Sequence, residues 1–358
     1  MGKFQFYLPQ NLSRQQRRAI DYEKAIFLTG VPGTGKTVVS IFRLLSASKQ
    51  GKKAILFTYG KLLRKTLEEK VEYKEDIQNI HRWLWDIQDT APKKELKTLL
   101  SEQNFESTLK LLRSKGIRYD EILVDEGQDL SINTYKILSK LTDKLSISAD
   151  QAQQINNKEE ASSEDEIKKL FPTLKEFELD EIFRSSYEIY RFAVQFVSNN
   201  ARANNPTLLE RLKKTNSGAD KPYVYLLNNL NAMYDVIGDI IDENPTDNIG
   251  ILFEHILPID QFTKKLEKDY EISTYHSIQK FVPSELKNII ITTFKSAKGI
   301  EFDIVIIPHF EDNDISNEEY YVGATRAKHQ VHFLTIGKKP EIIKNFDENS
   351  YELIDERA

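Results

Sequence analysis

The segment from Gly30 to Thr37 constrains this chain more than any other. It reads Gly-Val-Pro-Gly-Thr-Gly-Lys-Thr and matches every fixed position of the G-x-x-x-x-G-K-[ST] pattern. An apolar run at residues 25–29 precedes it, and an apolar-periodic stretch at residues 37–47 follows it. These flanks predict a strand, a loop and a helix in that order, which is the setting in which such a loop faces a phosphate.

Each fixed residue of this loop has a chemical reason. Glycines let the backbone curl so that N–H groups face a phosphate, and the following helix N-terminus adds partial positive charge. Lys36 is expected to be the point charge for the β- and γ-phosphates, and the Thr37 hydroxyl is expected to bind Mg²⁺. The loop predicts a bound nucleoside triphosphate, held by Gly30, Gly33, Thr34, Gly35, Lys36 and Thr37.

Two adjacent carboxylates, Asp125 and Glu126, close a second apolar run at residues 121–125. The carboxyl ends of parallel strands border the ligand crevice of such a sheet. We expect Asp125 to hold Mg²⁺ and Glu126 to polarise the attacking water, a base role that needs a carboxylate near the γ-phosphate. Together with the loop, this pair predicts hydrolysis and not binding alone.

Strand patterns alternate with helical patterns along the chain, which predicts an α/β fold with parallel sheets. A polar, acidic segment at residues 156–166 is the best candidate for a lobe boundary. We expect a first lobe at residues 1–165, a second at 166–345 and an acidic C-terminal tail at 346–358. Further strands are predicted at residues 54–58, 145–148, 223–227, 249–253, 289–293, 304–307 and 331–335.

Composition excludes several classes of protein. The 358 residues contain no cysteine, which excludes a disulfide scaffold, a thiolate zinc site, an iron–sulfur cluster and a cysteine nucleophile. No apolar run approaches 18 residues, and the N-terminal ten residues do not read as a signal peptide. We therefore expect a soluble cytoplasmic protein with no membrane partner.

The net charge of −5 is unevenly distributed. Residues 1–75 hold 15 Lys and Arg against 6 Asp and Glu, so the remainder is strongly acidic, chiefly at residues 159–181, 311–319 and 341–356. Such asymmetry predicts that a nucleic-acid strand is contacted locally by the basic part. The acidic surface of the second lobe is then available for a protein partner.

The order of motifs resembles the superfamily 1 helicases of the UvrD/Rep type, from Leu12 to about Leu334. In that resemblance the loop and Val124-Asp125-Glu126-Gly-Gln128-Asp129 are the two Walker motifs. The catalytic residues are then Lys36, Glu126, Gln153, Arg184 and Arg326, with Gln153 as γ-phosphate sensor, Arg184 at the γ-phosphate and Arg326 as arginine finger. The same resemblance makes Gln16 the adenine reader, Phe183 the ring that stacks on adenine and Glu301 the ribose ligand.

Other motifs of the resemblance contact the nucleic-acid strand. They are Phe57-Thr58-Tyr59, Asn79-Ile80-His81 and the segment that begins Thr293-Phe-Lys295. The strand contacts implied are Thr58, Tyr59, His81, Thr293 and Lys295. The resemblance implies two RecA-like P-loop NTPase lobes, ATP and Mg²⁺ as cofactors, and an ATP-dependent helicase or translocase on single-stranded DNA. RNA remains open as the strand.

The chain departs from the UvrD pattern in ways that keep a second hypothesis open. Lys36 and Asp125 are only 89 residues apart, and Arg184 and Thr293 only 109, which leaves no room for large accessory subdomains. No Trp follows Gln153, where the family often places a base-stacking ring. The alternative is a regulatory or sensor ATPase subunit of an antiphage or repair complex, with a nuclease or other effector on a partner chain. A metabolic P-loop kinase does not account for Arg184, Glu301 and Arg326.

Overall fold

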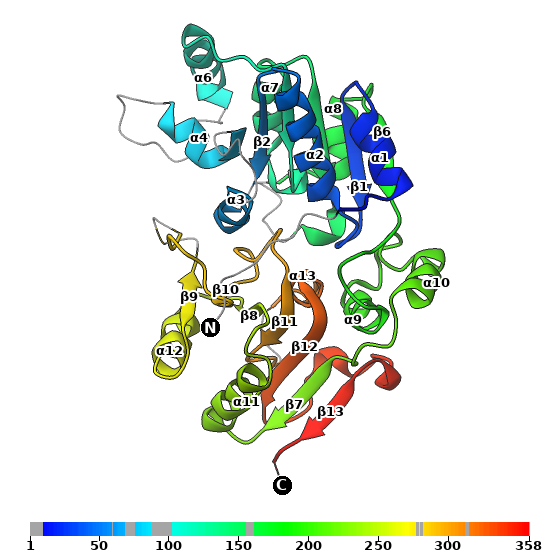
Figure 1. Ribbon diagram of the computed structural model, residues 1–358, viewed down its shortest axis with the longest axis vertical. Helices are drawn as coiled ribbons and strands as arrows, with labels where there is room; N and C mark the ends of the chain where they lie inside the picture. The colour runs from blue at the N-terminus through cyan, green and yellow to red at the C-terminus, as the bar shows by residue number, and fades with distance from the viewer. Residues whose placement is uncertain are drawn as a thin grey trace. The chain divides into compact units, whose positions relative to one another are not determined.

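The computed structural model describes residues 10–58, 60–68, 76–87, 102–154, 161–276, 279, 282–311 and 315–357. The chain divides into two compact units, with the boundary between Asp180 and Glu181. We call the described residues up to Asp180 the first unit and those from Glu181 the second unit. Figure 1 shows an α/β arrangement in each.

The first unit is built on a six-stranded sheet in the order β3-β2-β4-β5-β1-β6, and every pairing in it is parallel. Its central strands are buried at every residue, because helices cover both faces of a parallel sheet. The strands are β1 (Ile26–Gly30), β2 (Ala54–Thr58), β3 (Ile77–Asn79), β4 (Glu121–Val124), β5 (Leu145–Ala149) and β6 (Lys175–Leu179). The described helices are α1 (Arg14–Asp21), α2 (Lys36–Lys49), α3 (Lys61–Glu68), α4 (Ile80–Asp86), α6 (Glu102–Ser114), α7 (Ile132–Leu138) and α8 (Glu164–Leu170).

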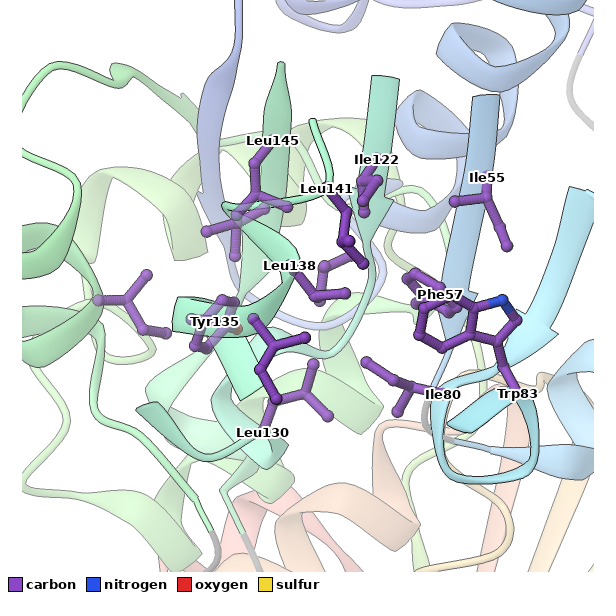
Figure 2. Packing of buried hydrophobic residues seen from close by; sticks show 14 of the residues in the cluster. Ile55, Phe57, Ile80, Trp83, Ile122, Leu130, Tyr135, Leu138, Leu141 and Leu145 are labelled. Carbon is purple, nitrogen blue, oxygen red and sulfur yellow. The ribbon is translucent and has the colours of Figure 1, made fainter. Parts of the chain in front are cut away.

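The two faces of this sheet carry separate apolar clusters. On one face, side chains of β2, β4 and β5 pack with α4, α6 and α7, and Phe57 meets Trp83 edge to face at 4.9 Å. Figure 2 shows this cluster, in which Tyr135 and Leu138 of α7 lie against the strands. On the other face a smaller cluster joins α1 and α2 to β1 and includes Ala19 and Val39. The phosphate loop joins β1 to α2, between these two faces.

The second unit is built on a seven-stranded sheet in the order β13-β7-β12-β11-β8-β10-β9, again with parallel pairings throughout. One face packs on α11 and α12, whose apolar side chains face the strands. The strands are β7 (Tyr223–Leu227), β8 (Ile249–Phe253), β9 (Ile272–Tyr275), β10 (Ile289–Thr293), β11 (Phe302–Ile307), β12 (Ala327–Ile336) and β13 (Glu352–Asp355). The described helices are α9 (Tyr187–Ala193), α10 (Pro206–Thr215), α11 (Leu230–Glu243), α12 (Leu257–Leu266) and α13 (Asn317–Ala324).

Both units are RecA-like α/β lobes with parallel sheets, which confirms the predicted fold class. The structure places residues 166–180 in the first unit, where α8 and β6 follow one another and β6 pairs with β1. It also places a strand within residues 346–358, because β13 pairs with β7 at the edge of the second sheet. Among the described helices, none combines the length and apolar character that crossing a membrane requires.

Candidate nucleotide site

The phosphate loop has the backbone that its glycines predict. Gly33 and Gly35 have φ angles of 80° and 87°, a region that side chains disfavour. A Cβ on Gly35 would lie 2.4 Å from Gln16 Nε2, so a side chain here would displace the Gln16 amide from the loop. Gly35 is the N-cap of α2, and the first N–H groups of that helix form an anion-binding end.

Lys36 lies at the centre of the site and is buried. Its Nζ donates hydrogen bonds to Gly30 O at 2.5 Å and to Val31 O at 3.2 Å, and it lies 3.6 Å from Asp150 Oδ2. A buried ammonium requires such partners, because desolvating an unpaired charge is costly. Lys36 is therefore held over the loop that would bind the phosphates.

Thr37 and Asp125 form the candidate Mg²⁺ site. Thr37 Oγ1 donates to Asp125 Oδ2 at 2.7 Å, and Asp125 is anchored through its N–H to Phe57 O at 2.9 Å. Burial and the neighbouring Glu126 raise the pKa of Asp125 to about 7, against the smaller effects of Thr37 and Lys36. A cation would relieve this unfavourable charge, and oxygen ligands of this kind suit Mg²⁺. Two protein oxygens would leave the remaining positions of a Mg²⁺ ion to phosphate and water, as is usual for this ion at nucleotide sites.

Glu126 is held in an unusual backbone conformation, with φ of 54°. Its Oε2 accepts a 2.7 Å hydrogen bond from Gln128 Nε2, and Gln128 Oε1 accepts from Asp150 N at 3.0 Å. A left-handed backbone conformation is strained at a residue other than glycine, and such strained residues cluster at functional sites. The conformation and Gln128 together orient the carboxylate expected to act as the base.

The next residue, Gly127, is fixed from the core. Tyr135 Oη donates to Gly127 O at 2.5 Å, and a Cβ on Gly127 would lie 2.5 Å from that same oxygen. Burial and the charge of Asp129 raise the pKa of Tyr135 well above its ordinary value, so the phenol keeps its donor proton.

Asp150 and Gln128 connect the predicted site residues with one another. Asp150 Oδ2 accepts from Gln153 Nε2 at 2.7 Å and also faces Lys36. Gln153 is buried, and Asp150 connects it to the loop lysine because its carboxylate contacts both side chains. Neither Asp150 nor Gln128 was among the predicted site residues, although Gln128 belongs to the quoted Asp125–Glu126 motif. The signal that could have found them is their position at the carboxyl edge of the sheet, where Asp150 directly follows β5 and Gln128 lies four positions after the end of β4.

Gln16 is buried on α1 and contacts the phosphate loop directly. Its Nε2 donates to Thr34 O at 3.0 Å, and its Oε1 accepts from Ser13 N at 2.9 Å in a capping box. The side chain thus joins the start of α1 to the loop.

The second unit gathers the predicted residues of its own motifs. Arg184 donates to Glu301 Oε1 through Nε at 2.7 Å and to Thr325 O at 3.2 Å. Burial works against the charge of Glu301, but Arg184, Lys328 and Arg326 outweigh it and lower the pKa of Glu301. The predicted ribose ligand and two predicted γ-phosphate cations therefore share one electrostatic cluster.

Two other side chains of this unit differ sharply in exposure. Arg326 is 1% exposed, and its Nε donates to Val322 O at 3.1 Å. Phe183 is 54% exposed although it is a large aromatic residue. An exposed phenyl ring next to Arg184 is available for stacking on a planar group.

Of the residues predicted to contact nucleic acid, Thr58 and Thr293 each lie at the end of a β-strand. Thr58 ends β2 and is buried, with its Oγ1 donating to Gly60 O at 3.3 Å. Thr293 ends β10 and bonds Ser296 Oγ at 3.1 Å, and Lys295 is exposed in the following turn. Tyr59 lies outside the described residues. His81 lies in the first turn of α4, and its side chain lies outside the described part.

Residues 23–239 match the sequence profile of the DNA/RNA helicase domain of Schlafen group 3. This match covers more than half of the chain. The chain belongs to the Schlafen group 3 helicase-domain family. As a member of this helicase family, it carries a helicase-type ATPase fold, to which the phosphate loop and Asp125–Glu126 pair correspond.

Two kinds of known protein resemble this Schlafen-type chain. RecBCD enzyme subunit RecB of Chlamydia pneumoniae is 33% identical over 118 residues, which are 29% of this chain and 10% of RecB. The chain thus spans about a tenth of that relative. Among solved structures, the C-terminal domain of a possible DNA helicase from Lactobacillus plantarum WCFS1 has a TM-score of 0.36 at 19% identity, covering 48% of this chain and 98% of that one. The arterivirus helicase, nonstructural protein 10, solved with DNA, has a TM-score of 0.44 at 11% identity, covering 92% of this chain and 64% of that one.

Proposed function

We propose that this chain is an ATP-dependent motor of the UvrD-like type, which hydrolyses ATP and couples hydrolysis to movement on single-stranded DNA. The observation that carries the proposal is the 2.7 Å contact between Thr37 and Asp125 beside the buried Lys36. A phosphate loop and a carboxylate from a distant strand meet there as nucleotide hydrolysis requires.

In the first unit, each side chain has a separate task. Lys36 binds the β- and γ-phosphates, and Thr37 and Asp125 hold Mg²⁺. A bound Mg²⁺ supplies charge neutralisation for the phosphates. Glu126, oriented by Gln128, accepts the proton of the attacking water. Gln153 senses the γ-phosphate. Asp150 contacts both Gln153 and Lys36 and so connects the sensor to the lysine that binds the phosphates.

In the second unit, four side chains have the nucleotide roles that the resemblance implies. Phe183 stacks on adenine, Glu301 binds the ribose, and Arg184 and Arg326 stabilise charge that develops on the γ-phosphate. An arginine in this role contributes about 10³–10⁵ in turnover. Hydrolysis removes the γ-phosphate, so Arg184 and Arg326 would lose the anion that they bind. The loss of such a contact is how hydrolysis drives a conformational change.

Strand contact is assigned to Thr58, Tyr59, His81, Thr293 and Lys295. Support comes from the excess of Lys and Arg in residues 1–75 and from the exposure of Lys295. Basic side chains bind phosphates of either nucleic acid, and binding of this kind weakens as salt rises. The experiment therefore tests single-stranded RNA as well as single-stranded DNA.

The experiment is a steady-state ATPase assay of the full chain with and without single-stranded DNA or RNA. We expect turnover that DNA stimulates and that Lys36→Ala abolishes, measured at two salt concentrations. Ser40→Ala is a matched control one turn further along α2, since the Ser40 hydroxyl contacts that of Ser148, which is not a predicted site residue. Turnover that no strand stimulates would contradict the motor.

One observation favours the second function, a regulatory ATPase subunit with an effector on a partner chain. The curated relative RecB is named as a subunit of an enzyme. Under this alternative, ATP is hydrolysed without a strand, and the protein co-purifies with a partner. Unwinding of a forked duplex by a lone monomer would exclude it.

A further inference from the structure

Arg43 is a buried charge that none of the tasks above uses. It lies in the middle of α2, two turns after Lys36, and only 3% of it is exposed. The guanidinium points away from the phosphate loop, towards the end of α1. A buried arginine persists only where its donors are met, so its partners indicate what it holds in place.

Four backbone carbonyls at the end of α1 and just beyond accept from Arg43. Nη1 donates to Ala19 O and Tyr22 O, both at 2.7 Å, and to Ile20 O at 3.4 Å, while Nη2 donates to Lys24 O at 3.0 Å. The last carbonyls of a helix have no partner within the helix and carry the negative end of its dipole. Arg43 therefore caps the C-terminus of α1 from a neighbouring helix.

The other edge of the guanidinium binds the strand that leads to Asp125. Glu121 begins β4, and its Oε1 accepts from Nε at 3.2 Å and from Nη2 at 2.8 Å of Arg43. Lys144 Nζ lies 2.7 Å from Glu121 Oε2 and balances the second carboxylate oxygen. The planar guanidinium of arginine can donate to the α1 carbonyls and to Glu121 at the same time, whereas the single ammonium group of lysine cannot.

The helix that Arg43 holds carries Gln16. One turn separates Gln16 from Ala19, and Gln16 Nε2 reaches Thr34 O of the phosphate loop. Ala19 is the fully buried residue that α1 contributes to the apolar cluster on this face, so the Arg43 contacts add polar fixation at the other end of the helix from its capping box. We propose that Arg43 is a positioning residue for base recognition, because it fixes α1 so that Gln16 stays at the phosphate loop. This inference rests on the proposed function, in which Gln16 reads adenine.

The test compares ATP and GTP as competitors of a fluorescent N-methylanthraniloyl-ATP at equilibrium, with melting temperature measured alongside. We expect Arg43→Lys to weaken ATP binding about fivefold to tenfold, the worth of one or two hydrogen bonds. GTP binding should change much less, so the preference for ATP falls to that of Gln16→Ala. The double variant Gln16→Ala with Arg43→Lys should lose no further preference, because both changes remove one recognition element.

A purely structural arginine gives a different pattern. If Arg43→Lys melts earlier and keeps the wild-type preference, the inference is overturned. Ser40→Ala, also buried on α2 but with its hydroxyl bonded to Ser148 on β5, should keep the preference. If Arg43→Lys fails to fold, Glu121→Gln loosens the guanidinium instead, and an unchanged preference there would count equally against the role. Wild-type protein that binds both nucleotides alike overturns this inference alone, whereas protein that binds neither overturns the proposed function with it.

Discussion

Thr37 Oγ1 donates a 2.7 Å hydrogen bond to Asp125 Oδ2, although 88 positions separate the two residues in the chain. The contact forms because β1 and β4 are parallel strands of one sheet and both end at its carboxyl edge. It makes the phosphate loop and the carboxylate pair a single site.

Loss of either charge in this site should stop turnover. We expect Lys36→Ala to abolish both nucleotide binding and hydrolysis, because it removes the ammonium group that binds the phosphates. Glu126→Gln should lower kcat by at least about 10²-fold while leaving ATP binding intact, since it removes only the base. Single-turnover hydrolysis and equilibrium binding measure the two effects separately. Retained turnover in Glu126→Gln would remove Glu126 from the base role.

The raised pKa of Asp125 predicts a pH-dependent stability in metal-free protein. The pKa is about 7 in the folded chain against 3.8 ordinarily, so the folded state binds this proton more tightly. Stability from this group is therefore lost as pH rises from about 4 to about 7 and is level above. Asp125→Asn cannot ionise, and its melting temperature relative to wild type should climb over that window.

Thermal melts in EDTA at intervals between pH 4.5 and pH 8 measure this difference. Asp260→Asn, at an exposed position of α12, is the matched control. A difference between Asp125→Asn and wild type that stays constant across the window would contradict the raised pKa.

Phe183 should matter for binding and hardly for folding. Its ring is 54% exposed, so Phe183→Ala should change the free energy of unfolding by less than about 0.5 kcal/mol. Stacking on a base is worth about 1–3 kcal/mol, so ATP affinity should fall by about fivefold or more. Phe192→Ala is the contrast, because Phe192 is fully buried and its loss should cost about 3–5 kcal/mol. Chemical denaturation and ATP titration should therefore rank the two variants in opposite orders, and equal ranks would refute the stacking role.

Lys295 should contribute one phosphate contact. Lys295→Ala should weaken single-stranded DNA binding and reduce the slope of log affinity against log salt by about one. Lys268→Ala is the control, since Lys268 is exposed in the same unit without a predicted contact. Fluorescence anisotropy at several salt concentrations gives both slopes, and identical slopes in the two variants would argue against contact at Lys295.

Much of the fold followed from apolar runs. The runs at residues 54–58, 223–227, 249–253 and 289–293 are strands with those bounds, because central parallel strands are apolar throughout. Strands β3, β6, β9 and β13 were not predicted. All four are edge strands of the two sheets, where exposed polar residues such as Glu176 or Glu352 interrupt the apolar pattern.

The site residues also differ in how far the sequence predicts them. Residues with a motif of their own, such as Lys36 and Asp125, could be predicted and lie together. The supporting contacts of Gln128, Asp150 and Arg43 could not, because each depends on which strands become neighbours. A sequence shows that Arg43 lies on a helix, but only the packing of α1 on α2 shows which carbonyls it reaches.

The bond from Tyr135 to Gly127 also bears on how genetic data from this chain would be read. A phenol of the apolar core holds the peptide beside Glu126, so a core substitution and a loss of the base would look alike in a screen for inactive variants. Only a melting measurement would separate them. Inactivity at position 135 therefore does not by itself identify a residue that touches the nucleotide.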